Sequence, residues 1–226
     1  MLADRFNTRP VEALLQKHAA HTEPYYVELM GFQFLIHPEV FNPTYTKVSG
    51  FLARNLDVQK GQSVLEMFCG SGAIGLSVAE KASQLVGVDI SPKAVQCSAE
   101  NAQQMGLSHK TEFRQGSLWQ AVKPTERFDV ILANPPLLPA IPETLLEMAV
   151  ADSPEMKLTS GFIAGLPKHL SDNGHALMAF SNACSVYLGD PMEYIRKQAE
   201  QSGVQSIIQD EWDVGYEVYR IIRFTK

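Results

Sequence analysis

Cysteine is scarce in this chain. The 226 residues include three cysteines, Cys69, Cys97 and Cys184, which are odd in number, widely spaced and free of any CxxC pair. A disulfide framework and a zinc site are therefore not expected, and we predict no bound metal. Unpaired thiols are typical of proteins of the reducing cytoplasm, which is the compartment we predict.

Long apolar runs and an excess of positive charge are also missing. No stretch of 18 apolar residues occurs, and Asp4 stands where a secretory signal would carry basic side chains, so we expect neither a membrane span nor a signal peptide. Lys and Arg number 19 against 25 Asp and Glu, a formal net charge of −6. This balance argues against long-range attraction to nucleic acid, although a local basic patch can still form on folding.

Internal repeats and Gly/Ser/Pro-rich linkers are absent, as are the GxSxG, HExxH and GxxxxGK[ST] motifs of other enzyme classes. The length of 226 residues, 45% of them hydrophobic, indicates one main domain with a sizeable core, which we expect over residues 41–226. We expect residues 1–40 to form a short N-terminal segment that covers part of the main domain. It consists of a helix over 10–20, which opens with a proline, and a hairpin that turns at Met30-Gly31.

From Gly61 onward, strand-like runs rich in Val, Ile and Leu alternate with amphipathic, helix-like segments. This rhythm predicts an α/β fold with a mostly parallel sheet and helices on both of its faces. The last two strands are separated by only a short turn, so they predict an antiparallel hairpin. The expected strands cover 62–68, 84–90, 110–116, 128–133, 174–181, 204–212 and 215–224, and the expected helices cover 72–82, 91–106, 156–170 and 191–203.

The most informative stretch is VLEMFCGSGAIG, residues 64–75, in which Gly70, Gly72 and Gly75 form a GxGxxG pattern between a strand and a helix. Such glycines permit a tight turn and let a ligand approach the backbone at the head of the helix. The pattern fits a dinucleotide site, another nucleoside cofactor or a purely structural turn. Glu66 lies four residues before Gly70, where its anion would suit a ligand with an ammonium and a sulfonium group better than a pyrophosphate. It could instead cap a backbone amide.

Two further motifs follow at the ends of predicted strands. Asp89 comes 17 residues after Gly72, where a carboxylate can accept both hydroxyls of a ribose, or can merely cap the next helix. Asn134-Pro135-Pro136 forms a stiff loop, because each proline restricts its own backbone and that of the preceding residue. The Asn134 side-chain oxygen and the Pro135 carbonyl can then accept hydrogen bonds from a planar NH₂ group, although such a loop can also be an ordinary strand exit.

In this order and spacing, the motifs at Glu66, Gly70, Asp89 and Asn134 resemble those of class I S-adenosylmethionine-dependent methyltransferases, specifically N-methyltransferases with an NPP motif. Within that class the chain resembles, over about residues 38–226, the "methyltransferase small" group. This group includes ribosomal RNA guanine-N2 methyltransferases and is related to release-factor glutamine methyltransferases. The resemblance implies a Rossmann-like sheet of seven strands, with S-adenosylmethionine as cofactor and S-adenosylhomocysteine as product.

The resemblance also implies roles for individual residues. Asn134, Pro135 and Pro136 would be catalytic, with Asn134 and Pro135 holding the acceptor nitrogen. Leu137 would contact the acceptor, and Trp119 or Tyr45 could supply the stacking aromatic that the family has at position 137. The chain departs from the family at Ser117, which replaces an acidic residue near the adenine, and at Leu137, which replaces a base-stacking aromatic. The residues implied to bind the cofactor are Thr44, Tyr45, Glu66, Phe68, Cys69, Gly70, Ser71, Gly72, Asp89, Ile90, Gly116, Ser117, Leu118 and Asn134.

The leading hypothesis is therefore methyl transfer from S-adenosylmethionine to a planar amide or amine nitrogen. The acceptor stays open between a protein glutamine, a small molecule and an RNA base. Family resemblance favours RNA or protein, whereas the net charge, the short N-terminus and Leu137 favour a protein or a small metabolite. Two alternatives are a non-catalytic subunit that binds the cofactor with the same fold, and an NAD-dependent oxidoreductase that uses the same glycine turn.

Overall fold

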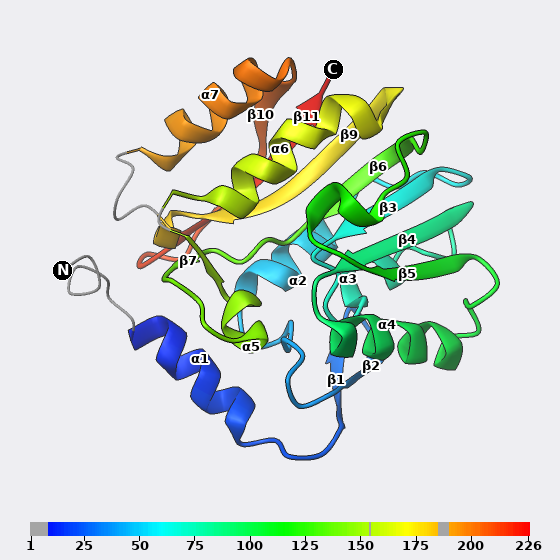
Figure 1. Ribbon diagram of the computed structural model, residues 1–226, viewed down its shortest axis with the longest axis vertical. Helices are drawn as coiled ribbons and strands as arrows, with labels where there is room; N and C mark the ends of the chain where they lie inside the picture. Colours follow the sequence, from blue (N-terminus) through cyan, green and yellow to red (C-terminus); the bar gives the residue numbers. More distant parts are fainter. Residues whose placement is uncertain (1–8, 154, 185–189) are drawn as a thin grey trace.

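The computed structural model describes residues 9–153, 155–184 and 190–226. Its centre is a seven-stranded sheet in the order β10-β11-β9-β6-β3-β4-β5 (Figure 1). Strand β11 runs antiparallel to both of its neighbours, and the other neighbouring pairs are parallel, so the predicted fold class is confirmed. The strands are β3 (Ser63–Met67), β4 (Gln84–Asp89), β5 (Thr111–Gln115), β6 (Phe128–Ala133), β9 (Leu170–Ser181), β10 (Gln205–Asp213) and β11 (Val218–Thr225).

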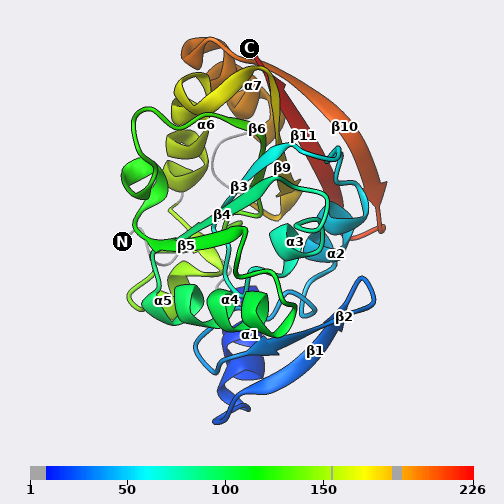
Figure 2. The same cartoon turned by 90° about the vertical axis from the view of Figure 1, so that its right-hand side faces the viewer.

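The sheet is covered on both faces, because its central strands are apolar on both sides. Val64 and Leu65 are neighbours on β3, are both fully buried, and belong to two different hydrophobic clusters. Figure 2 shows α2 and α6 on opposite sides of the sheet. The cluster that contains Val64, cluster one, includes residues of α2 (Lys47–Arg54), α3 (Ala73–Leu76) and α4 (Pro92–Gln104). The cluster that contains Leu65, cluster two, includes or contacts residues of α6 (Lys157–His169), α7 (Pro191–Ser202) and the 3₁₀ turn η2 (Leu118–Ala121).

The N-terminal helix and hairpin form as the sequence predicts. Helix α1 (Arg9–Ala19) is followed by β1 (Tyr25–Leu29) and β2 (Phe32–Ile36), which pair antiparallel. Met30 and Gly31 make the tight turn with φ of 55° and 80°, respectively. Phe34 is fully buried in cluster one, so the hairpin shares its core with the sheet. The domain boundary at residue 40 stays a prediction.

Helix α3 is shorter than the sequence predicts. We expected a helix over 72–82, but the α-helix ends at Leu76. The Ser77 hydroxyl donates a hydrogen bond to the Ile74 carbonyl at 2.6 Å, and the Val78 and Ala79 amides bond to carbonyls three residues back. These contacts tighten the backbone into successive turns, because serine competes with the helical hydrogen-bond pattern.

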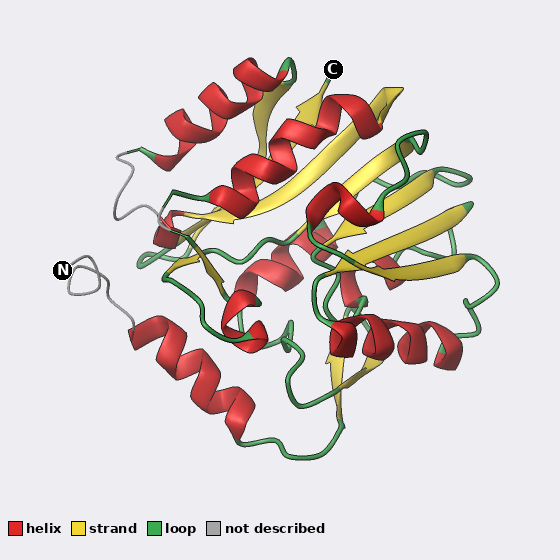
Figure 3. Cartoon of the chain, viewed as in Figure 1, coloured by secondary structure: helices red, strands yellow, loops and turns green. Residues whose placement is uncertain are grey.

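The segment 138–152 carries elements that the sequence does not predict. It contains β7 (Leu138–Pro139), which pairs in parallel with β8 (Ala151–Asp152), and the single-turn helix α5 (Leu145–Met148). Thr144 and Glu147 form a reciprocal capping box at the start of α5. Figure 3 shows helix α1 lying next to α5. These two parts of the chain, far apart in sequence, meet in a small cluster around Val11, Val150 and Ala151.

None of the helices in the described ranges is long and apolar enough to cross a membrane. Over the same ranges, no group of three or more His, Cys, Asp and Glu side chains is arranged to hold a metal ion.

Candidate active site

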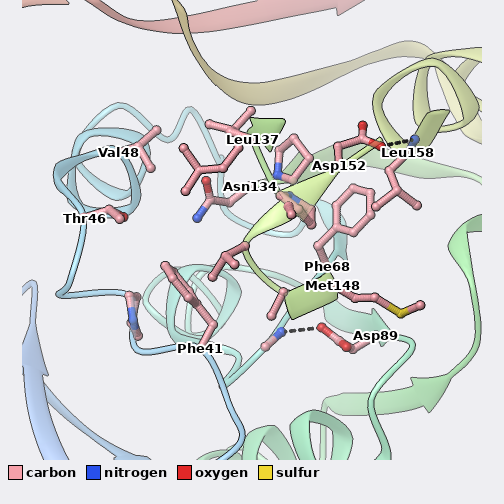
Figure 4. A pocket seen from close by; sticks show the side chains of 18 of the residues that line it. Phe41, Thr46, Val48, Phe68, Asp89, Asn134, Leu137, Met148, Asp152 and Leu158 are labelled. Atoms are coloured by element: carbon pink, nitrogen blue, oxygen red, sulfur yellow. Dashed lines mark hydrogen bonds between the residues drawn. The ribbon is translucent and has the colours of Figure 1, made fainter. Parts of the chain in front are cut away.

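A cavity of about 1000 Å³ opens at the carboxyl ends of β3, β4 and β6, the edge where open parallel sheets bind ligands (Figure 4). The loops that follow these strands supply the predicted motifs. Helices α1 and α2 and the 138–152 segment line the remaining sides. The three motifs, which are separated by up to 70 residues in the sequence, therefore lie on one cavity wall.

The backbone of this wall is strained. Phe68 and Leu118 both line the cavity and have φ of 60° and 51°, in the left-handed region that non-glycine residues rarely adopt. Gly70 has φ of 54°, and a Cβ added to it would meet no atom within 4 Å, so its open face borders the cavity. Strained residues of this kind cluster at ligand sites, where the surrounding fold holds them in place.

Glu66 lies near the end of β3 with 3% of its surface exposed. Its Oε2 accepts a hydrogen bond from the Gly75 amide at 3.1 Å, so part of its role is to cap α3. Burial raises the pKa of Glu66 to about 8, and the negative charge of Asp89 adds to the rise. None of the ion pairs recorded for the described residues neutralises Glu66. A buried carboxylate without a cation favours a cationic ligand group in the adjoining cavity.

Asp89 ends β4 and joins the glycine turn to the next loop. Its Oδ2 accepts from the Gly70 amide and its Oδ1 accepts from the Ser91 amide, both at 2.9 Å. Ser91, not Asp89, is the N-cap of α4, because the Ser91 hydroxyl accepts from the Ala94 amide. Burial raises the pKa of Asp89 as well. The carboxylate is thus fixed by two amides at the cavity wall, where its remaining lone pairs can accept from ligand hydroxyls.

Asn134 follows β6 directly, and its side chain is held in one orientation. Its Nδ2 donates to Oγ of Ser49, a fully buried residue of α2, at 2.9 Å. The Oδ1 atom is buried and has no hydrogen-bond partner within the protein. An unpaired buried acceptor costs about 1–3 kcal/mol, so this atom favours a ligand that donates a hydrogen bond to it.

Carboxylates outnumber lysines on the cavity wall. Among the described residues that line it there are two lysines, Lys47 and Lys157, against five carboxylates. Asp152, one of the five, accepts hydrogen bonds from the Leu158 and Thr159 amides and so caps the start of α6. The wall therefore carries more acidic than basic side chains.

A protein-family profile described as a methyltransferase domain matches residues 58–213. A putative protein N5-glutamine methyltransferase of Methanocaldococcus jannaschii is 33% identical over 154 residues, which cover 66% of this chain and 75% of that protein. The chain belongs to the methyltransferase domain family.

A second curated protein and a solved structure are also similar to this chain. A 23S rRNA (uracil(747)-C(5))-methyltransferase of Proteus mirabilis is 31% identical over 61% of this chain, which spans 35% of that protein's length. The 16S rRNA N2 G1207 methyltransferase of T. thermophilus, solved with S-adenosylmethionine and guanosine, has a TM-score of 0.62 at 18% identity over 90% of this chain and 50% of that chain, which shows a common fold. The predicted S-adenosylmethionine-dependent methyltransferase is confirmed, and neither alternative, the non-catalytic cofactor-binding subunit or the NAD-dependent oxidoreductase, is favoured.

Most of the residues predicted to form the site lie on the cavity wall of the methyltransferase. Besides Glu66, Asp89 and Asn134, the lining residues include Tyr45, Phe68, Cys69, Gly70, Ser71, Ile90, Gly116, Ser117, Leu118, Pro135, Pro136 and Leu137. Their roles in binding stay predictions, but their convergence agrees with the resemblance.

Three predicted residues do not line the cavity. Trp119 packs on α6 instead: its Nε1 donates to the Gly161 carbonyl at 2.9 Å, and its ring stacks on His169 with centroids 4.8 Å apart. Thr44 turns back to Asn42, to which its hydroxyl donates at 2.8 Å. Gly72 faces α4, where an added Cβ would meet Ser98 Cβ at 2.9 Å, so this glycine serves close helix packing.

Sequence reasoning missed two groups of residues in this methyltransferase. Ser49, which holds Asn134, lies in a helix with no motif around it. The lining residues of α1 and of the 138–152 segment, such as Leu14, Leu145 and Met148, are ordinary apolar residues in the sequence. The proline-rich run Pro135 to Pro142 was a usable signal that the chain leaves the sheet here in an extended form.

Proposed function

We propose that this methyltransferase binds S-adenosylmethionine with the loops after β3, β4 and β5, and methylates a planar NH₂ nitrogen held by Asn134 and Pro135. We place the reaction in the cytoplasm, because all three cysteines are buried, unpaired thiols. The bound cofactor supplies a methyl group on a positively charged sulfur.

The chemistry of the wall supports this cofactor. Glu66 binds the ammonium of its methionine part, which supplies the countercharge that this buried carboxylate lacks. Asp89 accepts the ribose hydroxyls, and the open face of Gly70 lets the cofactor approach the backbone. Ser117 lines the adenine side in place of an acidic residue.

The observation that carries the proposal is the buried Asn134 Oδ1 without a partner. Because Ser49 occupies Nδ2, this oxygen is free to accept an N–H of the acceptor. Held there and at the Pro135 carbonyl, the acceptor nitrogen presents its lone pair to the methyl carbon. When bound, S-adenosylmethionine would supply a methyl group whose transfer to nitrogen would leave the C–S electron pair on sulfur, while Asn134 Oδ1 and the Pro135 carbonyl would orient the nitrogen and water would take its surplus proton. Positioning of this kind lowers a barrier without a strong base.

The test separates cofactor binding from transfer. Calorimetric titration with S-adenosylhomocysteine measures the first, and incorporation of labelled methyl groups from S-adenosylmethionine into a cell extract measures the second. We expect Asn134→Ala to lose about 1–3 kcal/mol of transition-state stabilisation, roughly 5- to 150-fold in rate, with cofactor affinity nearly unchanged.

Asn55→Ala is the matched control. Asn55 is also half-buried, but it caps the end of α2 and does not line the cavity. It should leave the transfer rate within about twofold. Absence of S-adenosylhomocysteine binding would refute the cofactor site, and full transfer activity in Asn134→Ala would refute the role of Asn134.

A further inference from the structure

Thr46 carries a second buried polar atom of the cavity wall that has no partner. Four buried side-chain polar atoms in the described ranges lack a hydrogen bond, and two of them, Asn134 Oδ1 and Thr46 Oγ1, belong to residues that line the cavity (Figure 4). The proposed function uses only the first. A buried hydroxyl without a partner is unfavourable, because it has lost its hydrogen bonds to water. Thr46 therefore favours a ligand that bonds to its hydroxyl.

Thr46 is the N-cap of helix α2, but its side chain does not cap the helix. Its backbone has the extended conformation usual for an N-cap, with φ of −127° and ψ of 153°. The hydroxyl of such a threonine normally accepts a hydrogen bond from the second or third helical amide, here that of Val48 or Ser49. Thr46 makes no such bond to the described part of the chain. Its hydroxyl is therefore free to serve a ligand.

The neighbours of Thr46 in the chain place it beside Asn134. Ser49, whose Oγ accepts from Asn134 Nδ2 at 2.9 Å, follows Thr46 by one helical turn and so lies on the same side of α2. The Lys47 Nζ atom lies 5.5 Å from the ring centroid of Tyr216, in the turn between β10 and β11. The start of α2 is thus held between the loop after β6 and the β10–β11 turn.

The order of the strands separates Thr46 from the proposed cofactor site. Strands β3, β4 and β5, whose loops are proposed to bind the cofactor, lie on one side of β6, and β9 and β11 lie on the other. Helix α2 packs on β9 and β11 as well as on α3, and its first residue reaches the β10–β11 turn. Thr46 therefore lies on the side of Asn134 that faces away from the proposed cofactor site, where the acceptor must enter.

The chemistry of a planar NH₂ group supplies a partner for this hydroxyl. Such a group is planar when its nitrogen shares its lone pair with an adjacent C=X unit, in which X is a carbonyl oxygen or a ring nitrogen. X is rich in electrons and needs a hydrogen-bond donor when it leaves water. Asn134 Oδ1 and the Pro135 carbonyl accept the two N–H groups in the proposed function, and Ser49 occupies Asn134 Nδ2. The Thr46 hydroxyl can donate where these groups cannot.

We propose that Thr46 is a specificity-determining residue, which donates a hydrogen bond to the atom X next to the methylated nitrogen. The acceptor is then an amide or amidine, H₂N–C=X, and not an alkylamine or an aniline. This inference rests on the proposed function, because it places the NH₂ group at Asn134. It goes beyond that function in naming the unit that the site selects and the residue that selects it.

Two isomers, 2-aminopyridine and 3-aminopyridine, are matched probes. They have the same size and the same atoms, but only in 2-aminopyridine is the ring nitrogen bonded to the carbon that carries NH₂. Binding is measured by NMR titration of the complex with S-adenosylhomocysteine, at a pH where both isomers are uncharged. We expect the wild type to prefer 2-aminopyridine about fivefold, the contribution of one hydrogen bond. Thr46→Val keeps the shape of the side chain but cannot donate, so it should bind the two isomers equally.

Thr111→Val is the control variant. The Thr111 hydroxyl is also on a half-buried residue, but it donates to the Leu107 carbonyl at 3.1 Å on strand β5, and Thr111 does not line the cavity. This variant should keep the preference for 2-aminopyridine. Neither variant should change the affinity for S-adenosylhomocysteine more than about twofold. Thr46→Val should also leave Tm unchanged, because Thr46 makes no capping bond that the valine would lose.

The labelled cell extract distinguishes the sources of the acceptor, since a glutamine amide and a nucleobase both contain H₂N–C=X. Separation into protein, RNA and small molecules shows which fraction carries the methyl group. In that fraction, Thr46→Val should lower the initial rate about fivefold and Thr111→Val should not. An unchanged rate in Thr46→Val would overturn the inference.

Failure of this inference is distinguishable from failure of the proposed function. If the wild-type protein does not bind S-adenosylhomocysteine, the proposed function fails. If it does, the inference is overturned when 2-aminopyridine does not bind, when the wild type binds both isomers equally, or when Thr46→Val keeps the preference. Loss of the preference in Thr111→Val would overturn it as well. A fall in S-adenosylhomocysteine affinity in Thr46→Val, with the preference retained, would assign Thr46 to the cofactor instead.

Discussion

We expect Glu66 to make cofactor binding depend on pH. Its pKa of about 8 means that near neutral pH the carboxyl is mostly protonated in the free protein, because burial disfavours the anion. An ammonium group of the cofactor favours the anion, so binding below pH 8 must release a proton. Affinity therefore rises with pH until the carboxyl is already ionised in the free protein.

We expect the affinity for S-adenosylhomocysteine to increase roughly tenfold between pH 6.5 and pH 8, as measured by calorimetry in buffers of different ionisation enthalpy. Glu66→Gln removes the titrating group without changing the side-chain size. It should bind more weakly at pH 8 and lose most of the pH dependence. An unchanged pH profile in Glu66→Gln would assign the dependence to another group.

Glu66 is also one of the residues whose position in the site could be predicted from the local sequence. Glu66, Asp89 and Asn134 were predictable because each lies at or next to the carboxyl end of an apolar strand, and parallel strands bring such residues to one edge of the sheet. Trp119 was predicted to contact the acceptor, but it packs on α6 and does not line the cavity. A large aromatic beside a motif can turn either way, and here Gly161 and Phe162 on α6 offer carbonyls to its indole N–H. Such a partner, distant in sequence, leaves no local signal.

At the scale of elements, the regular strands and long helices followed their hydrophobic periods. The 138–152 segment did not, because its two-residue strands and single-turn helix are too short to show a period. They exist because β7 and β8 pair with each other and α1 packs on the segment. The side of the cavity that the 138–152 segment lines was therefore outside the reach of sequence patterns, whereas the wall formed by the loops after β3, β4 and β6 was not.

Helix α1 should be released in acid. His18 is 3% exposed, its Nε2 has no partner, and its ring lies 4.9 Å from that of Tyr45. Burial, together with a smaller effect of the charge of His21, lowers the pKa of His18 to about 4. Below the ordinary pKa of about 6.5, the unfolded chain binds a proton that the folded chain refuses, so stability falls as pH falls from 6.5 to 4.

Hydrogen exchange measures this effect on the element itself. Between pH 7.5 and pH 5, the protection factors of α1 amides should fall about tenfold more than those of α4. His18→Leu keeps an apolar side chain at this position and cannot take up a proton, so its α1 should keep its protection at pH 5. A loss of α1 protection of the same size in His18→Leu would show that another group controls the docking.

At the scale of the whole molecule, the order of elements was sufficient to predict the architecture. Alternating strands and helices impose parallel neighbours with crossover helices, and the closing pair without a helix between them must run antiparallel. The outcome agrees down to β10 and β11, whose register is continuous except for one irregularity between Ile208 and Asp210. What the order of elements could not specify was how the N-terminal helix closes the cavity.

Because helix α1 lines the cavity, the cavity wall is built from segments that lie far apart in the sequence. Its wall combines α1, α2, the ends of β3, β4 and β6, the 138–152 segment and residues 216–219, so a ligand that fills it contacts segments from both the N-terminal and the C-terminal parts of the chain. A ligand that binds only the folded state stabilises it by about 2.7 kcal/mol at 100 times its dissociation constant. For a protein of this size, that corresponds to a rise in Tm of roughly 5–11 °C.

We expect this rise in one cooperative transition when S-adenosylhomocysteine is added at 100 times its dissociation constant and unfolding is followed by calorimetry. Ile207→Ser, on the edge strand β10 where Ile207 is 60% exposed, provides the control. It changes a surface far from the cavity wall, so the ligand-dependent rise should equal that of the wild type. Two unfolding transitions, with only one of them raised in temperature by the ligand, would contradict the prediction that the protein unfolds as a single cooperative unit. They would show that the N-terminal helix and hairpin unfold separately from the sheet.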